Sequence, residues 1–167
     1  MPPPDVNFFA DRIAATRSPA MRDMFAARAE IMRLCDASAA AVLTPMEPGR
    51  IGRAERFALA SRISRWNGDA ALADRYGRQL DEMSACPVLR ALGLGEMPEL
   101  DARQAAIVTY VDIVTKDPVK AGRAEIAAMQ SAGLTDADVV RLAELVAFVN
   151  FQARVMAGLT LIEEHAA

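Results

Sequence analysis

The chain has 167 residues, of which 53% are hydrophobic and 25% are charged, a composition typical of a globular protein. This length predicts one domain over residues 1–167, with residues 1–4 as an extended leader. The formal net charge of -3 predicts no nucleic-acid partner, because phosphate binding needs a concentrated basic surface.

The sequence also predicts a cytoplasmic protein with reduced thiols. Its start, Met1 to Asp5, has neither the basic nor the apolar segment of a secretion signal, and the sequence contains no uninterrupted run of about 18 apolar residues, the length that spans a membrane. The two cysteines, Cys35 and Cys86, are 51 positions apart, which fits neither a disulfide framework nor a metal site. We therefore expect no membrane partner, no metal and no cofactor.

The first half of the chain predicts helices throughout. A short helix from Asp5 to about Arg17 precedes a second one, which begins with Ser18 as N-cap and Pro19 at N1 and runs towards Val42. The apolar residues of the second helix recur on one broad stripe that includes Cys35, which is therefore expected to be a small core residue. This stripe consists of Met24, Phe25, Ile31, Met32, Cys35, Ala39 and Val42.

A loop over 44–49 precedes the second half of the chain, which is also predicted to be helical. We expect helices over 53–66, from Asp69, from Cys86-Pro87 to about Gly95, over 101–116, over 119–132 and from 136 to about 162. Thr135 and Asp138 form a variant of the capping box before the last helix. No segment alternates with a period of two, so the predicted fold class is all-α.

The last helix is apolar on almost every side between Leu142 and Phe151, where only Glu144 and Asn150 are polar. A bundle of this size has limited room for a helix that is covered all round, so this pattern favours a subunit interface. One side carries small residues, including Ala157, and a predicted Asn150–Arg154 pair one turn apart. The interface candidates are Ala143, Ala147, Phe148, Asn150, Phe151 and Arg154.

The most informative stretch is residues 67–76, Asn-Gly-Asp-Ala-Ala-Leu-Ala-Asp-Arg-Tyr. Asn67-Gly68 is a favoured left-handed end for the preceding helix, and Asp69 suits the N-cap of the next one. A thiol at position 69 would meet the positive end of the helix dipole, which lowers a thiol pKa. The carboxylate of Asp69 gains the same electrostatic stabilisation but cannot attack a peroxide.

This stretch, together with Phe148-x-Asn150-Phe151-x-x-Arg154, resembles the AhpD-like branch of the carboxymuconolactone decarboxylase (CMD) family. There an Asn-Gly turn leads into Cys-x-x-Cys-x-x-x-His, and a proton-relay Glu lies twelve residues before the first Cys. On this chain those four positions are Asp69, Leu72, Tyr76 and Phe57, so the family's redox residues are all replaced. Glu55 is no substitute, because two residues turn a helix by about 200°.

The resemblance covers residues 52–83 and 134–161 and implies an AhpD-like multi-helix bundle with an interface-forming C-terminal helix. It favours a noncatalytic homo-oligomeric scaffold, or a partner of a related subunit that keeps the cysteine pair. The alternatives are a non-thiol enzyme of the decarboxylase type and a small-molecule binder. The ligand-binding candidates are Asp69, Arg75, Tyr76 and Arg154.

Two other residues, His165 and Cys86, are of types that can act as catalytic groups. His165 is the only histidine and is the third residue from the end of the sequence, so a solvated tail position is the expectation. Cys86 precedes Pro87 at a predicted helix start, yet no second cysteine or histidine lies close in sequence to activate it. The sequence therefore assigns no catalytic residue, and it favours a protein without a Cys-x-x-Cys peroxidase activity.

Overall fold

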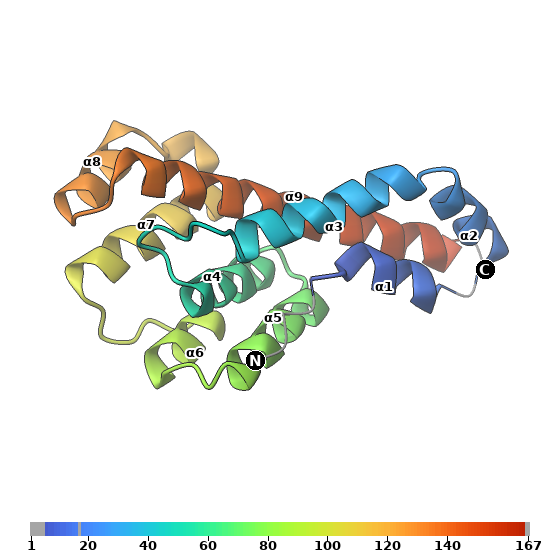
Figure 1. Ribbon diagram of the computed structural model, residues 1–167, viewed down its shortest axis with the longest axis horizontal. Coiled ribbons are helices and arrows are strands. Elements are labelled where there is room, and N and C mark those ends of the chain that lie inside the picture. Colours follow the sequence, from blue (N-terminus) through green and yellow to red (C-terminus); the bar gives the residue numbers. More distant parts are fainter. Residues whose placement is uncertain (1–5, 17, 166–167) are drawn as a thin grey trace.

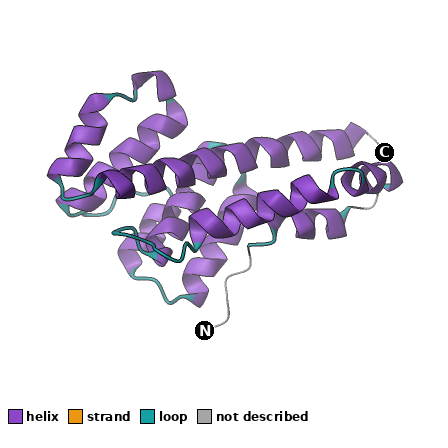
Figure 2. Ribbon diagram, turned by 45° about the horizontal axis from the view of Figure 1, so that its top comes forward, coloured by secondary structure: helices purple, strands orange, loops and turns teal. Residues whose placement is uncertain are grey.

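The computed structural model describes residues 6–16 and 18–165, which form α-helices and loops with no strand among them (Figures 1 and 2). The all-α prediction is therefore confirmed. In Figure 1, α4 to α8 lie towards one end, α1 and α2 towards the other, and α9 runs the length of the molecule and links them. The elements are α1 (Phe8–Ala15), α2 (Pro19–Ala26), α3 (Ala29–Leu43), α4 (Arg53–Trp66), α5 (Ala70–Glu82), α6 (Pro87–Gly93), α7 (Ala102–Lys116), the 3-10 turn η1 (Pro118–Lys120), α8 (Arg123–Ser131) and α9 (Asp136–His165).

Helix α4 is the central element, although it is rich in charged residues. It packs against α5, α6, α7 and α9, and every residue from 55 to 64 is buried. Two of these residues are arginines, Arg56 and Arg62, and each of them is only 1% exposed to solvent. Buried cations are stable only where hydrogen bonds or counter-charges replace water, so the fold depends on their partners.

Arg56 is held by backbone carbonyls alone. Its guanidinium donates to the carbonyl oxygens of Ile51 at 3.0 Å, Val42 at 2.8 Å and Pro48 at 2.9 Å. Burial is the main cause of a lowered pKa for Arg56, and the nearby Arg141 adds to the effect. The side chain thus ties the end of α3 and the following loop to α4.

Arg62 is held by a carboxylate and by the segment after α6. Its Nε and Nη2 donate to the two Oδ atoms of Asp112 in α7 at 2.7 and 2.8 Å, and Nη1 donates to the Glu96 carbonyl at 2.8 Å. Trp66 Nε1 donates to the same Asp112 at 3.0 Å, and Lys116 lies 3.5 Å from the Trp66 ring centre. This bidentate pairing joins α4 to α7.

Several predicted boundaries are confirmed. The helix over 53–66 and the loop over 44–49 are present as expected, and the Ser18 Oγ accepts from the Met21 amide at 3.4 Å. Thr135 and Asp138 cap α9 reciprocally, with the Thr135 amide donating to Asp138 Oδ2 at 3.0 Å and the Asp138 amide donating to Thr135 Oγ1 at 3.2 Å.

The predicted second helix is wrong in one respect, because it breaks between α2 and α3. The break turns Met21 and Phe25 onto Leu159 of α9, and these three residues form a second, smaller hydrophobic cluster. Ile31, expected on the buried stripe, is 55% exposed. Cys35 is half-buried and packs against the main core, as expected of a small core residue.

Two further helix limits differ from prediction. The start and end expected for the first helix, Asp5 and Arg17, lie outside the described residues, and within them α1 begins at Phe8. The helix expected from Val119 is interrupted, because Pro118–Lys120 forms a 3-10 turn and α8 begins only at Arg123.

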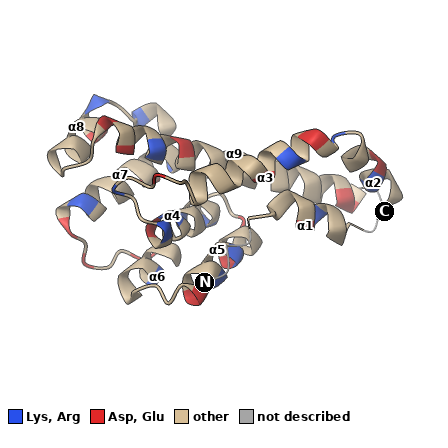
Figure 3. Ribbon diagram, viewed as in Figure 1, with Lys and Arg blue, Asp and Glu red and all other residues tan. Residues whose placement is uncertain are grey.

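Helix α9 is the longest element and contacts α3, α4, α7 and α8. By length and composition it would suffice to cross a membrane, but its inner face packs against the other helices of the chain, which is an ordinary cause of such a sequence. Lys and Arg lie interspersed with Asp and Glu over the helices (Figure 3).

Candidate functional site

The turn between α4 and α5 has the predicted geometry. Asn67 is the C-cap of α4, and Gly68 adopts a φ of 78°. Asp69 is the N-cap of α5, and its carboxylate accepts a hydrogen bond from the Leu72 amide at 2.9 Å. The positive φ is the reason for glycine at position 68. Asn67 Nδ2 donates to Asn150 Oδ1 at 2.9 Å, which ties this turn to α9.

Two of the four positions to which the resemblance assigns redox chemistry, Phe57 and Tyr76, meet in space, but they carry aromatic rings. Tyr76 of α5 and Phe57 of α4 are fully buried, and their ring centres lie 6.0 Å apart in an edge-to-face arrangement. The Phe8 ring of α1 makes a second ring contact with Tyr76, with 5.0 Å between the two ring centres, so the three rings form an aromatic cluster. Leu72 is also buried and belongs to the same main hydrophobic core.

One polar pair lies inside this cluster. The Tyr76 hydroxyl donates to Gln152 Oε1, and the Gln152 amide nitrogen is buried without a hydrogen-bond partner among the described residues. Burial is the main cause of the raised pKa of Tyr76. A buried phenol with a raised pKa remains protonated at neutral pH and is a poor proton shuttle.

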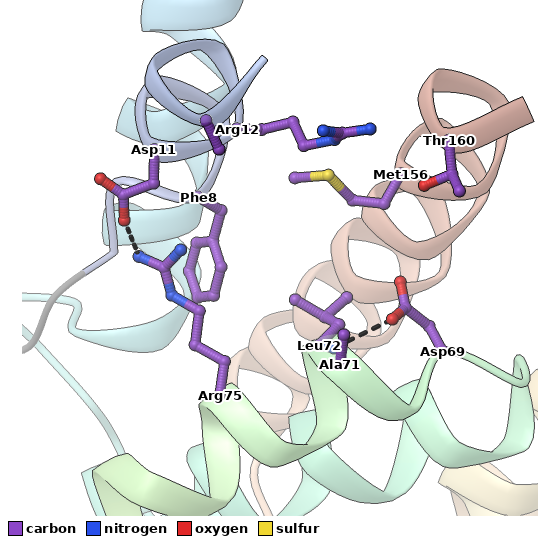
Figure 4. A pocket seen from close by; sticks show the side chains of 10 residues that line it. Phe8, Asp11, Arg12, Asp69, Ala71, Leu72, Arg75, Met156 and Thr160 are labelled. Atoms are coloured by element: carbon purple, nitrogen blue, oxygen red, sulfur yellow. Dashed lines mark hydrogen bonds and ion pairs between the residues drawn. The ribbon is translucent and has the colours of Figure 1, made fainter. Parts of the chain in front are cut away.

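Above the cluster lies a cavity of about 330 Å³ between α1, the first turn of α5 and the second half of α9 (Figure 4). Arg75 crosses one side of it, bonds to Asp11 at 2.5 Å and lies 4.3 Å from the Phe8 ring centre. Arg12 lines the other side and pairs with Glu163 at 2.6 Å. The lining residues are Phe8, Asp11, Arg12, Ala15, Asp69, Ala71, Leu72, Arg75, Met156 and Thr160.

The ligand-binding candidates fall in three different places. Asp69 and Arg75 line the cavity, whereas Tyr76 is buried in the aromatic cluster with Phe8. Arg154 is exposed on α9, donates to the Asn150 carbonyl at 3.1 Å and does not line the cavity.

The cavity also includes residues that sequence reasoning missed. Phe8 and Arg12 come from α1, and Met156 and Thr160 come from α9. No motif marks these positions, because they reach the cavity only through the packing of helices that are distant in sequence.

The two cysteines lie away from this site and do not line the cavity. Cys35 is on α3, where burial and then the charge of Asp36 raise its pKa. Cys86 is exposed and is the N-cap of α6. No cluster of three or more potential metal ligands occurs among residues 6–16 and 18–165.

The interface candidates on α9 divide into buried and accessible residues. Phe148 and Asn150 are buried. The expected contact between Asn150 and Arg154 forms through the Asn150 backbone carbonyl, whereas the Asn150 side chain accepts a hydrogen bond from Asn67. Ala143 is half-buried. The accessible candidates are Ala147, Phe151 and Arg154, and Ala157 on the same helix is also exposed.

Comparison with known proteins identifies a fold but no sequence family. No family model matches the chain, and no curated protein matches it. The structure resembles an uncharacterized peroxidase-related protein from Silicibacter sp. TM1040, with a TM-score of 0.70 and 20% identity over 79% of this chain and 69% of that one. It also resembles the alkylhydroperoxidase AhpD core of an uncharacterized peroxidase-related protein from Ralstonia eutropha JMP134, with a TM-score of 0.70 and 20% identity over 95% of this chain and 88% of that one. The chain therefore has an AhpD-like, all-α fold.

Proposed function

We propose that this protein is a redox-silent AhpD-like protein, which acts as a noncatalytic homo-oligomeric scaffold or as the partner of a related subunit that keeps the cysteine pair. The observation that carries the proposal is the aromatic closure of the site by Phe8, Phe57 and Tyr76. Catalysis by a thiol peroxidase needs a thiolate beside a proton-transferring group. At these positions the chain provides a capping carboxylate, an aliphatic side chain and two aromatic rings.

The oligomeric part of the proposal is supported by large apolar side chains that remain exposed. On α9 these are Phe151 at 43%, Leu161 at 58% and Ile162 at 47%. On α3, Ile31 and Leu34 are 55% and 50% exposed. Leu161 and Ile162 are adjacent in sequence, and neighbouring exposed apolar residues are typical of protein–protein contacts. The CMD resemblance, a cytoplasmic location and the absence of nucleic-acid and membrane partners belong to the same proposal.

A second candidate function, small-molecule binding without turnover, is favoured by the cavity beside Asp69. Its lining combines apolar side chains, among them Phe8, Leu72 and Met156, with the cations Arg12 and Arg75. Such a combination suits a small carboxylated ligand that competes for the arginines with their present carboxylate partners. The decarboxylase-type alternative has less support, because the buried Tyr76 is unsuited to proton transfer.

The test is thiol-dependent peroxide consumption by the purified wild type beside Cys35→Ser and Cys86→Ser, with the molar mass measured by light scattering. The proposal expects consumption no faster than buffer for all three proteins and a mass above that of one chain. Turnover that one substitution abolishes would overturn redox silence, and a monomer at all concentrations would overturn the oligomer. Ligand-dependent thermal stabilisation without product would support the second candidate.

A further inference from the structure

The outer face of α9 carries a seam with coiled-coil spacing. Its six residues are separated alternately by four and three positions, and all six are exposed. In a coiled coil, residues spaced alternately by four and three positions form one line along the helix, and this line faces the partner helix. The seam consists of Val140, Glu144, Ala147, Phe151, Arg154 and Gly158.

This seam is complementary to itself when it is read backwards. Reflection about position 149 exchanges Glu144 with Arg154 and Ala147 with Phe151. It also exchanges Val140 with Gly158. Each exchange joins an acid to a base, or a larger side chain to a small residue. A contact between two identical helices about a two-fold axis requires this kind of self-complementarity.

We propose that the seam binds the same seam of a second copy of this chain, with the two α9 helices antiparallel and crossing near position 149. Glu144 of each copy then meets Arg154 of the other, Phe151 lies over Ala147, and Val140 lies over Gly158. This arrangement rests on the homo-oligomer of the proposed function and specifies its contact.

The charges of the seam support a partner outside the subunit. Neither Glu144 nor Arg154 forms a salt bridge among the described residues, and both side chains are exposed. Glu144 interacts electrostatically with the buried Arg56, but the Arg56 guanidinium donates its hydrogen bonds to backbone carbonyls instead. Glu144 and Arg154 lie ten positions apart on α9, which is about 15 Å at ~1.5 Å per residue, so they cannot pair within one helix.

Gly158 gives a second, independent indication. It lies inside α9, and a Cβ added there would meet nothing within 4 Å in the subunit. Glycine inside a helix is less stable than alanine by about 1 kcal/mol, so internal packing gives no reason for it. Close approach of a neighbouring helix does give a reason, because the absence of a side chain leaves room for Val140 of the second copy.

A second copy of the chain explains the seam better than a lipid surface does. Glu144 and Arg154 flank the centre of the stripe, where a membrane-facing helix would place both charges in the apolar phase. In the antiparallel pair the same two charges meet opposite charges. Binding to lipid vesicles without self-association would overturn the proposal.

The test is exchange of the two charges in the full chain, followed by sedimentation equilibrium over a range of concentrations. Glu144→Arg and Arg154→Glu each place like charges in contact twice, so each should weaken self-association about tenfold or more. The double variant should restore association. An equimolar mixture of the two single variants should form a 1:1 heterodimer, because every contact then joins opposite charges. Glu99→Arg and Arg123→Glu, both exposed outside the seam, are the matched controls.

Gly158→Ala separates a contact effect from misfolding. The substitution should raise the stability of the isolated helix and yet weaken self-association, because its methyl group opposes Val140 of the partner. If the wild type associates and these exchanges and Gly158→Ala leave association unchanged, the antiparallel pairing is wrong while the redox-silent oligomer stands. A monomeric wild type would overturn both the pairing and the oligomer, and the peroxide assay would still judge redox silence.

Discussion

The Tyr76 ring lies edge to face against the Phe57 ring, with 6.0 Å between the centres, where α5 crosses α4. These are the two positions to which the family resemblance assigns a histidine and a glutamate. They are neighbours in space, as an acid–base pair requires, but here they carry aromatic rings in the core. These two positions therefore lie side by side in this fold, and their side chains form part of its hydrophobic core.

The hydrogen bond between Tyr76 and Gln152 should stabilise the fold. Tyr76→Phe leaves Gln152 Oε1 buried without its donor, so the free energy of unfolding should fall by roughly 1–3 kcal/mol. Urea denaturation followed by circular dichroism measures this. Combining Tyr76→Phe with Gln152→Leu should recover most of the loss, and Tyr110→Phe, on the half-buried Tyr110 of α7, is the control. Equal stability of Tyr76→Phe and wild type would show that this bond contributes nothing net.

Arg56 should be among the side chains whose loss costs the most stability. Arg56→Met leaves three backbone carbonyls, those of Val42, Pro48 and Ile51, without their donor. Hydrogen bonds from charged groups contribute ~1.5–3 kcal/mol, so a loss of more than about 2 kcal/mol is expected. Chemical denaturation of Arg56→Met beside the exposed Arg33→Met checks this, since the control should stay within ~0.5 kcal/mol. A small loss at Arg56 would mean that water replaces its donors.

The limits of α4 were predictable from sequence, because they depend on local chemistry. Asn67-Gly68 ends the helix through a positive φ at Gly68, and Asp69 starts the next helix through its own carboxylate. The central position of α4 was not predictable in this way. Its arginines suggest a solvated helix, and only the distant carbonyls and Asp112 explain their burial.

The cavity was predictable only in part for the same reason. Asp69 and Arg75 lie in the recognisable stretch, whereas Phe8 and Arg12 reach the cavity through the docking of α1. The break between α2 and α3 depends on a similar long-range contact, that of Phe25 with Leu159. Periodicity reports which face of a helix is apolar, but not which partner covers it.

Asp138 should make the stability of the fold depend on pH in the acidic range. Burial opposes its ionisation, but hydrogen bonds from Arg50 and Thr135 and the charge of Arg141 outweigh burial and lower its pKa from 3.8 to about 2. The unfolded chain then binds a proton more readily, so this contribution is present above about pH 4 and is lost as the pH falls towards 2. Urea midpoints measured between pH 7 and pH 3 should decline less steeply below pH 4 for Asp138→Asn. The exposed Glu99→Gln should keep the wild-type profile.

Asp69 should contribute to folding and not to redox turnover. Its carboxylate accepts from the Leu72 amide at the start of α5, so Asp69→Ala should lower the free energy of unfolding by about 1 kcal/mol, while Asp69→Asn, which also caps helices, should stay close to wild type. Thermal and urea denaturation of the three proteins measure the difference. Both variants should retain the wild-type molar mass and show no change in peroxide consumption, because the side chain only accepts a hydrogen bond there. Peroxide turnover that depends on the Asp69 carboxylate would contradict this purely structural role and would make Asp69 a catalytic residue.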